Sequence, residues 1–142
     1  MSRDHTVTLT VPADGAYLGV LRTAAAGLAA RLQFTLDEIE DLRIAVDEAC
    51  AMLIRLTAPS EELRCRFSLD GERLRVEVAV TGAAVAPDTS TFAWQVLASL
   101  ADEVSAALDG PTASITLTAR RESTGRSRPE ASGRTLTACG RA

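Results

Sequence analysis

The chain has 142 residues, 46% of them hydrophobic, which is enough to bury one hydrophobic core but short for two domains. Its formal net charge of −4 gives no overall attraction to nucleic-acid phosphates, so direct nucleic-acid binding is not expected. The sequence shows neither a charged start followed by an apolar signal core nor a run of about 18 apolar residues, so we expect a cytoplasmic protein without a membrane span.

A strand and a helix are predicted first. Residues 6–11 alternate polar and apolar side chains, the two-residue period of a half-buried strand, and Pro12 ends this run. Asp14 follows, where its carboxylate can accept hydrogen bonds from the free amides of a helix start. Apolar residues then recur at intervals of three and four from Leu18 to Leu32, which predicts a first helix with one apolar face.

A second helix is predicted to begin after Thr35. The Thr35 hydroxyl and the Glu38 carboxylate can each accept a hydrogen bond from the backbone amide of the other residue, an arrangement known as a capping box. A continuous apolar stripe then extends from Ile39 to Leu56. Pro59 marks the end of the helix shortly beyond that stripe.

The clearest local signal is a hairpin. Residues 63–69 and 74–80 both alternate apolar and polar side chains. Between them, Asp70-Gly71 suits a tight turn whose central residues need positive φ. One face of this hairpin is apolar, and the other carries charged residues: Arg64, Arg66, Arg75 and Glu77.

The remaining elements complete a two-layer fold. After a loop over residues 81–90, helical spacing predicts a third helix over residues 92–108, and alternation predicts a last strand over 114–119. The expected order is β-α-α-β-β-α-β, which we interpret as an α/β (α+β) two-layer sandwich in a single domain, residues 1–121. Residues 122–142 have the composition of a disordered, solvated tail.

Four segments of the chain resemble one family. "DLRIAVDEAC" (residues 41–50) resembles the first conserved helix of bacterial anti-sigma factors of the RsbW and SpoIIAB type, serine kinases of the GHKL ATPase superfamily. "SLADEVS" (99–105) and "ASITLTARR" (113–121) resemble the last helix and closing strand of that family, at matching distances along the chain. With "TFAWQVL" (91–97), they are most similar to its actinobacterial branch, which includes UsfX and UshX.

The resemblance implies a fold, an activity and partners. The fold is the GHKL or Bergerat-like sandwich. The implied activity is phosphorylation of a serine on a STAS-domain anti-anti-sigma factor. The unphosphorylated antagonist displaces an alternative sigma factor from the anti-sigma homodimer, a mechanism called partner switching. No membrane or nucleic-acid contact is implied.

The resemblance places the catalytic carboxylate of the family at Glu48, where it would accept the proton of the substrate serine. One helical turn later the family has an asparagine that holds magnesium, whereas this chain has Met52. A thioether is a poor ligand for Mg²⁺, which requires oxygen. Met52 therefore predicts the loss of ordinary Mg-ATP binding, and Glu48 is then a relic of the catalytic site or simply a solvated helix carboxylate.

The glycine-rich nucleotide elements that the resemblance implies are also altered. The family's Asp-x-Gly-x-Gly box, which recognises adenine, corresponds to a stretch here that contains Thr81 and Gly82 but no acid. Its Gly-x-Gly phosphate loop corresponds to Thr91-Phe92-Ala93-Trp94. We predict a degenerate nucleotide cleft and no metal site. Phe92 and Trp94 are expected to fill the core, and the alternative is that they plug the vacated cleft.

One family feature is retained in the first helix. The resemblance places at Arg22 the arginine that contacts the sigma factor and, in turn, the antagonist. A guanidinium can pair bidentately with an acidic group of a partner and so anchor an interface. Arg22 is therefore the predicted partner-binding residue.

Three functions remain open at this point. The first is an anti-sigma factor that binds and sequesters an alternative sigma factor of the stress or developmental class, without any cofactor. The second is an active serine kinase that uses ATP and magnesium, with Glu48 as the base and a STAS-domain protein as substrate. The third is a sensor that binds another small ligand in the old nucleotide cleft.

The three cysteines are not expected to bind a metal, because they are far apart and have no Cys-x-x-Cys or Cys/His spacing. Cys50 and Cys65 fall on apolar faces and are interpreted as small buried hydrophobic residues. Cys139 lies in the predicted tail and is the one cysteine expected to be exposed to oxidants.

Overall fold

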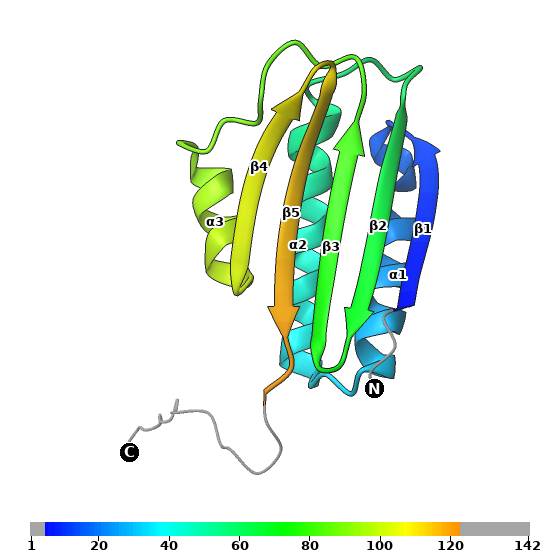
Figure 1. The fold of residues 1–142 in the computed structure, drawn as a ribbon, viewed down its shortest axis with the longest axis vertical. Helices are drawn as coiled ribbons and strands as arrows, with labels where there is room; N and C mark the ends of the chain where they lie inside the picture. The colour runs from blue at the N-terminus through cyan, green and yellow to red at the C-terminus, as the bar shows by residue number, and fades with distance from the viewer. Residues whose placement is uncertain (1–4, 123–142) are drawn as a thin grey trace.

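A computed structural model describes residues 5–122, which form a five-stranded sheet with the helices on one face (Figure 1). The helices are α1 (Leu18–Arg31), α2 (Leu36–Ile54) and α3 (Phe92–Leu100), and a 3₁₀ turn, η1 (Gly15–Tyr17), precedes α1. The strands are β1 (His5–Pro12), β2 (Glu62–Asp70), β3 (Arg73–Val80), β4 (Glu103–Asp109) and β5 (Thr112–Arg120). The sheet order is β1-β2-β3-β5-β4, and each strand pairs antiparallel with its neighbours. The predicted two-layer α+β class is confirmed.

The starts of the helices are set by local hydrogen bonds. Asp14 Oδ1 accepts from Ala16 N at 2.9 Å and caps η1, which continues directly into α1. At the start of α2, Glu38 Oε1 accepts from Thr35 N at 2.7 Å, and Thr35 Oγ1 accepts from Glu38 N at 3.1 Å. The predicted capping box is therefore present, and amides at the helix start that have no partner within the helix are satisfied.

The β2–β3 hairpin forms as predicted. Asp70 lies opposite Arg73, and Gly71 makes the turn with a φ of +63°. On the covered face, Phe67 lies opposite Val76, and both are fully buried. The other face of the hairpin is polar, as expected for an antiparallel sheet with one solvated side.

The third helix is shorter than predicted. It ends at Leu100, and residues 103–109 form β4, which pairs with β5 so that Val104 lies opposite Leu117. The prediction of a helix to residue 108 is wrong because Leu100, Val104 and Leu108 are spaced by four, a spacing that a helix and a two-residue strand period share. The observed order has one more strand, β-α-α-β-β-α-β-β.

Two cysteines belong to the core. Cys50 of α2 and Cys65 of β2 are fully buried, which confirms their interpretation as small hydrophobic residues. Burial raises the pKa of the Cys65 thiol from its ordinary value of 9.0 to about 12, and it raises the pKa of Cys50 well above the same value. Both thiols are thus poor nucleophiles at neutral pH.

Some predictions fall outside the part of the chain that the structure describes. Cys139 and the predicted tail, apart from Glu122, are among them. Between residues 5 and 122, no helix combines the length and the apolar character that a membrane crossing requires.

Candidate functional site

One face of α2 carries the predicted catalytic position and its neighbour. Glu48 and Met52 are four residues apart and so lie on the same helix face, one turn from each other. Glu48 is half-buried, and Met52 is 7% exposed. Met52 lines a cavity of about 160 Å³ together with Thr91 and Ala93. Three residues predicted for the nucleotide cleft are thereby brought together between the C-terminal half of α2 and the start of α3, whereas Glu48 is not among the lining residues.

The rim of this cavity carries charges of both signs, from Arg55 and Asp88. Asp88 Oδ1 accepts hydrogen bonds from Ser90 Oγ at 2.6 Å and from Ser90 N at 2.9 Å. These two bonds lower the pKa of the Asp88 carboxyl below its ordinary value. An anionic ligand at this rim would meet the Asp88 carboxylate together with the Arg55 guanidinium, so the rim charges alone neither select nor exclude an anion. The volume is below the roughly 300–1,000 Å³ typical of small-molecule sites.

A backbone amide at the start of α3 is hydrogen-bonded by the capping residue of the helix. Thr91 Oγ1 accepts a hydrogen bond from Trp94 N at 3.1 Å, so this amide is already satisfied within the chain. Free amides at a helix start are what a phosphate group binds. The Trp94 amide is thus not free to bind a phosphate group at this helix start.

The two aromatic residues at this helix start have different surroundings. Trp94 is half-buried and packs against the core, whereas Phe92 is 78% exposed. The prediction that Phe92 fills the core is wrong. Leu97 is the buried residue of α3, and Phe92, five positions before it, is turned by about 140° around a helix of 3.6 residues per turn.

Thr81 and Gly82 directly follow β3 and are not among the residues that line the cavity. Thr81 Oγ1 donates to Glu61 Oε1 at 2.9 Å, and Thr57 Oγ1 donates to the Thr81 carbonyl at 2.5 Å. Gly82 has a φ of +81°. These contacts fasten the end of β3 to the segment that follows α2, which is a structural role.

Arg22, the predicted partner-binding residue, lies on α1 and faces α2. Its Nη1 is 3.6 Å from Asp47 Oδ1, and the two side chains are 41% and 39% exposed. Sequence spacing could not reveal this pair, because the residues belong to different helices. The pair is accessible to a partner from outside the molecule.

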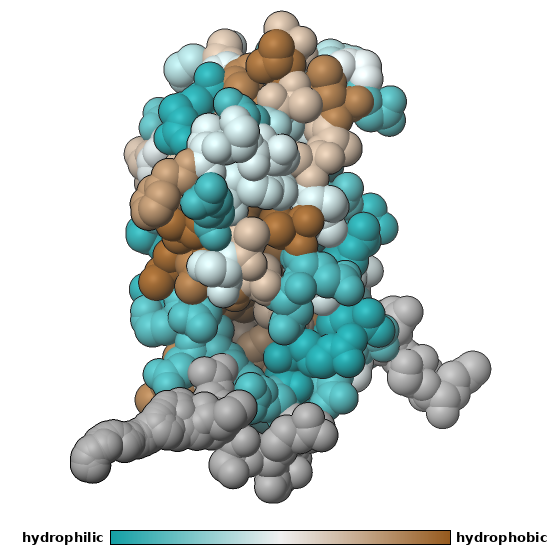
Figure 2. Space-filling model, turned by 90° about the vertical axis from the view of Figure 1, so that its left-hand side faces the viewer, coloured by the Kyte–Doolittle hydropathy of each residue, from teal (hydrophilic) through white to brown (hydrophobic). Residues whose placement is uncertain are grey.

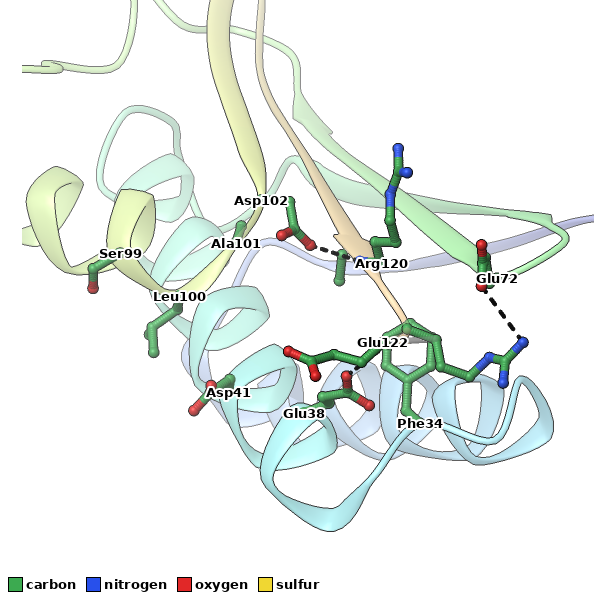
Figure 3. Close-up of a pocket in the computed structure, with 12 residues that line it drawn as sticks. Phe34, Glu38, Asp41, Glu72, Ser99, Leu100, Ala101, Asp102, Arg120 and Glu122 are labelled. Atoms are coloured by element: carbon green, nitrogen blue, oxygen red, sulfur yellow. Dashed lines mark hydrogen bonds and ion pairs between the residues drawn. The ribbon is translucent and has the colours of Figure 1, made fainter. Parts of the chain in front are cut away.

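A larger cavity of about 660 Å³ lies at the other end of α2 and was not predicted (Figure 3). Several of its charged side chains already hold the fold together: Asp102 Oδ2 accepts from Arg120 N at 2.7 Å, and Arg121 Nη2 lies 3.6 Å from Glu72 Oε1. Seen from the side of α3 and β4, this end of the molecule is mostly hydrophilic, and apolar side chains gather nearer the opposite end (Figure 2). No local signal could have indicated this cavity, because it requires α2, the end of α3 and the end of β5 to meet.

Comparisons with known proteins identify the family. The family model described as "Histidine kinase-like ATPase domain" matches residues 11–119. The protein named anti-sigma-F factor RsbW from Mycobacterium tuberculosis is 36% identical over 130 residues, which cover 84% of this chain and 76% of that protein. The chain belongs to the RsbW family of histidine kinase-like ATPase domains. The resemblance found in the sequence is confirmed, and its assignment to the actinobacterial branch stays a prediction.

Other RsbW proteins match over shorter segments. The protein named serine-protein kinase RsbW from Bacillus subtilis is 39% identical over 79 residues, which cover 54% of this chain and 49% of that kinase. The match therefore spans about half the length of the Bacillus kinase. The crystal structure of the RsbU and RsbW domains of Rv1364c from M. tuberculosis matches 82% of this chain and 32% of that chain, with a TM-score of 0.65 and 16% identity. At this identity the likeness supports the RsbW-type fold alone.

Proposed function

We propose that this RsbW-family chain is an anti-sigma factor that binds and sequesters an alternative sigma factor without using ATP. Its relatives include both a protein named a serine-protein kinase and one named an anti-sigma-F factor, so the residues of this chain must distinguish the two functions. The observation that carries the choice is Met52. A buried thioether stands where the resemblance requires an oxygen ligand for magnesium.

The surroundings of Met52 support the same choice. The cavity beside it, of about 160 Å³, is small for a nucleotide. The Trp94 amide, a potential phosphate donor, is capped by Thr91. These residues do not fit Mg-ATP.

The partner surface supports the binding function. Arg22 retains a 41% exposed side chain on α1, and exposed arginines with free donors are common anchors of interfaces. Sequestration requires a surface of this kind but no reactive group. Because sigma factors act on RNA polymerase, this function would place the protein in the cytoplasm.

Two measurements test the proposal. Calorimetric titration with Mg-ATP should give no heat of binding. Copurification with each alternative sigma factor encoded in the same genome should give a stable complex with at least one of them. Tight Mg-ATP binding, or the absence of any such complex, contradicts the proposal.

A serine kinase is the second candidate, because Glu48 is retained at the position of the family's base and the Bacillus relative is named a kinase. Incubation with Mg-ATP and the STAS-domain proteins of the same genome should yield no phosphoserine. Phosphoserine that appears with the wild-type chain and disappears with Glu48→Gln would establish the kinase instead.

We also propose a homodimer, on the family resemblance alone. Light scattering coupled to size-exclusion chromatography should give twice the chain mass of 15.0 kDa. A single-chain mass at micromolar concentration would overturn this part.

A further inference from the structure

The cavity of about 660 Å³ at the start of α2 is lined by apolar and charged side chains. Phe34 is 7% exposed and belongs to the core, and Leu100 and Ala101 are partly buried against that core. Five carboxylates and two guanidinium groups complete the lining: Glu38, Asp41, Glu72, Asp102 and Glu122, with Arg120 and Arg121. The volume lies within the roughly 300–1,000 Å³ typical of ligand sites. The excess of carboxylates favours an occupant that carries positive charge.

Several of these charged groups already have partners, but Asp41 does not. Glu38 accepts from two backbone amides, and Asp102 accepts from Arg120 N. Asp41 lies one turn after Glu38 on α2 and is half-buried, and in the described part of the chain its side chain makes no hydrogen bond or ion pair. It lies below Asp102 in Figure 3. This half-buried carboxylate is therefore open to a cation from outside the described fold.

The same lining contains a buried donor without an acceptor. Arg121 Nη2 pairs with Glu72 Oε1 at 3.6 Å, but Arg121 Nε is buried and meets no acceptor among the described residues. A buried polar atom of this kind costs free energy until it finds a partner. An occupant that supplies both a cation and a carbonyl oxygen would satisfy Asp41 and Arg121 together. A peptide segment that contains arginine supplies both.

The chain itself has such a segment at the edge of the cavity. Glu122, the last described residue, lines the cavity, and residues 123–142 follow it with four arginines and one glutamate. Arg126 and Arg128 come four and six residues after Glu122, a maximum chain span of about 13–22 Å. Attachment through so short a linker gives an effective concentration of the order of millimolar, so a weak contact is enough to hold the segment.

We infer that residues 123–130 dock in this cavity of their own chain, with Arg126 or Arg128 paired to Asp41 and a backbone carbonyl accepting from Arg121 Nε. The inference goes beyond the proposed function and does not depend on it. Composition alone predicts a solvated tail, and charge complementarity with the cavity is what favours docking. The docked segment connects the end of β5 to the start of α2 and closes the cavity to other basic ligands.

The test uses backbone amide NMR spectra of the full chain at low salt. Asp41→Asn should shift the amide signals of residues 123–130, although these residues are far from Asp41 in sequence. The reciprocal double variant Arg126→Gln with Arg128→Gln should shift the amide signals of Leu100 and Ala101, which line the cavity. Both effects should shrink at about 1 M salt, where the Debye length is roughly 3 Å.

Each test variant has a matched control. Asp37→Asn removes an exposed carboxylate from the first turn of α2, outside the cavity lining, and should leave the signals of residues 123–130 unchanged. Arg134→Gln with Arg141→Gln removes the same charge farther along the chain and should leave the cavity signals unchanged. The dispersion of the other amide signals shows whether each variant is folded.

Three results would overturn the inference. The first is that Asp41→Asn leaves residues 123–130 unshifted in a folded chain. The second is that either control shifts the signals as much as its test variant does. The third is that the shifts depend on protein concentration, which would place the segment in the cavity of a second copy rather than in its own.

Discussion

The Glu38 carboxylate joins the start of α2 to Glu122, two residues after the end of β5. Its Oε2 accepts from Glu122 N at 3.0 Å (Figure 3). Its Oε1 accepts from Thr35 N at 2.7 Å. Although it carries a charge, Glu38 is 8% exposed. One side chain thus satisfies two backbone amides that are far apart in sequence, and it fixes where the chain leaves the sheet.

Removal of this carboxylate should destabilise the fold. Glu38→Ala leaves the amides of Thr35 and Glu122 without their acceptor, at a cost of about 1–3 kcal/mol. Urea unfolding measures this loss. Glu40→Ala, an exposed change on the same helix, should alter the free energy of unfolding by about 0.5 kcal/mol or less. Equal stability of the two variants would rule out the proposed role of Glu38.

Alanine substitutions at two glycines should change the free energy of unfolding in opposite directions. Gly82 has a φ of +81°, and an added Cβ would lie 3.3 Å from Thr57 Oγ1, so Gly82→Ala should destabilise the fold by about 1–2 kcal/mol. Gly27 lies within α1 with nothing within 4 Å of an added Cβ. Gly27→Ala should stabilise it by about 0.5–1 kcal/mol. Chemical denaturation of both variants checks the signs, and a neutral Gly82→Ala would contradict the backbone geometry.

Restoring the family asparagine should not restore nucleotide binding. Met52→Asn places an amide in a site that is 7% exposed and removes buried apolar surface, so we expect a loss of about 2–4 kcal/mol and no heat with Mg-ATP. Met52→Leu, which conserves volume, should cost less than about 1.5 kcal/mol. Mg-ATP binding by folded Met52→Asn would show that this one residue blocks the site.

The buried thiols should make the fold sensitive to alkaline pH. The pKa of Cys65 rises from 9.0 to about 12 on folding, so below pH 9 both states keep the proton and no stability is lost. Between pH 9 and 12 the unfolded chain releases a proton that the folded chain retains, so the free energy of unfolding should fall. The chain contains no lysine, so no lysine amine titrates in this interval.

Denaturant unfolding at several pH values measures the fall. The free energy of unfolding should fall less steeply with pH in Cys65→Ala than in the wild type, because one of the two buried thiols is gone. An identical slope in both proteins would argue against burial of Cys65 as its source.

Most of the fold could be predicted because its signals are local. The capping box of Thr35 and Glu38 and the Asp70-Gly71 turn depend on residues within four positions of one another, and the structure has both. The prediction failed at β4, because the spacing of Val104 and Leu108 fits both a helix and a strand. Pairing with β5 decided between them, and that pairing is a tertiary contact.

The candidate site was less accessible to sequence reasoning. The family resemblance predicted Arg22 and Met52 as site residues, and the structure places Met52 beside Thr91 and Ala93 at one cavity. Asp47 was assigned no chemistry from the sequence, because its partner Arg22 lies on another helix. The exposure of Phe92 was likewise set by the orientation of α3, which spacing alone does not give.

The most direct test is the dissociation constant of the sigma-factor complex, measured in nucleotide-free buffer and again with saturating Mg-ATP. The complex should form without nucleotide, with the same dissociation constant in both conditions. A complex that forms only with Mg-ATP, or one whose affinity changes about tenfold or more on its addition, would contradict a nucleotide-independent anti-sigma factor.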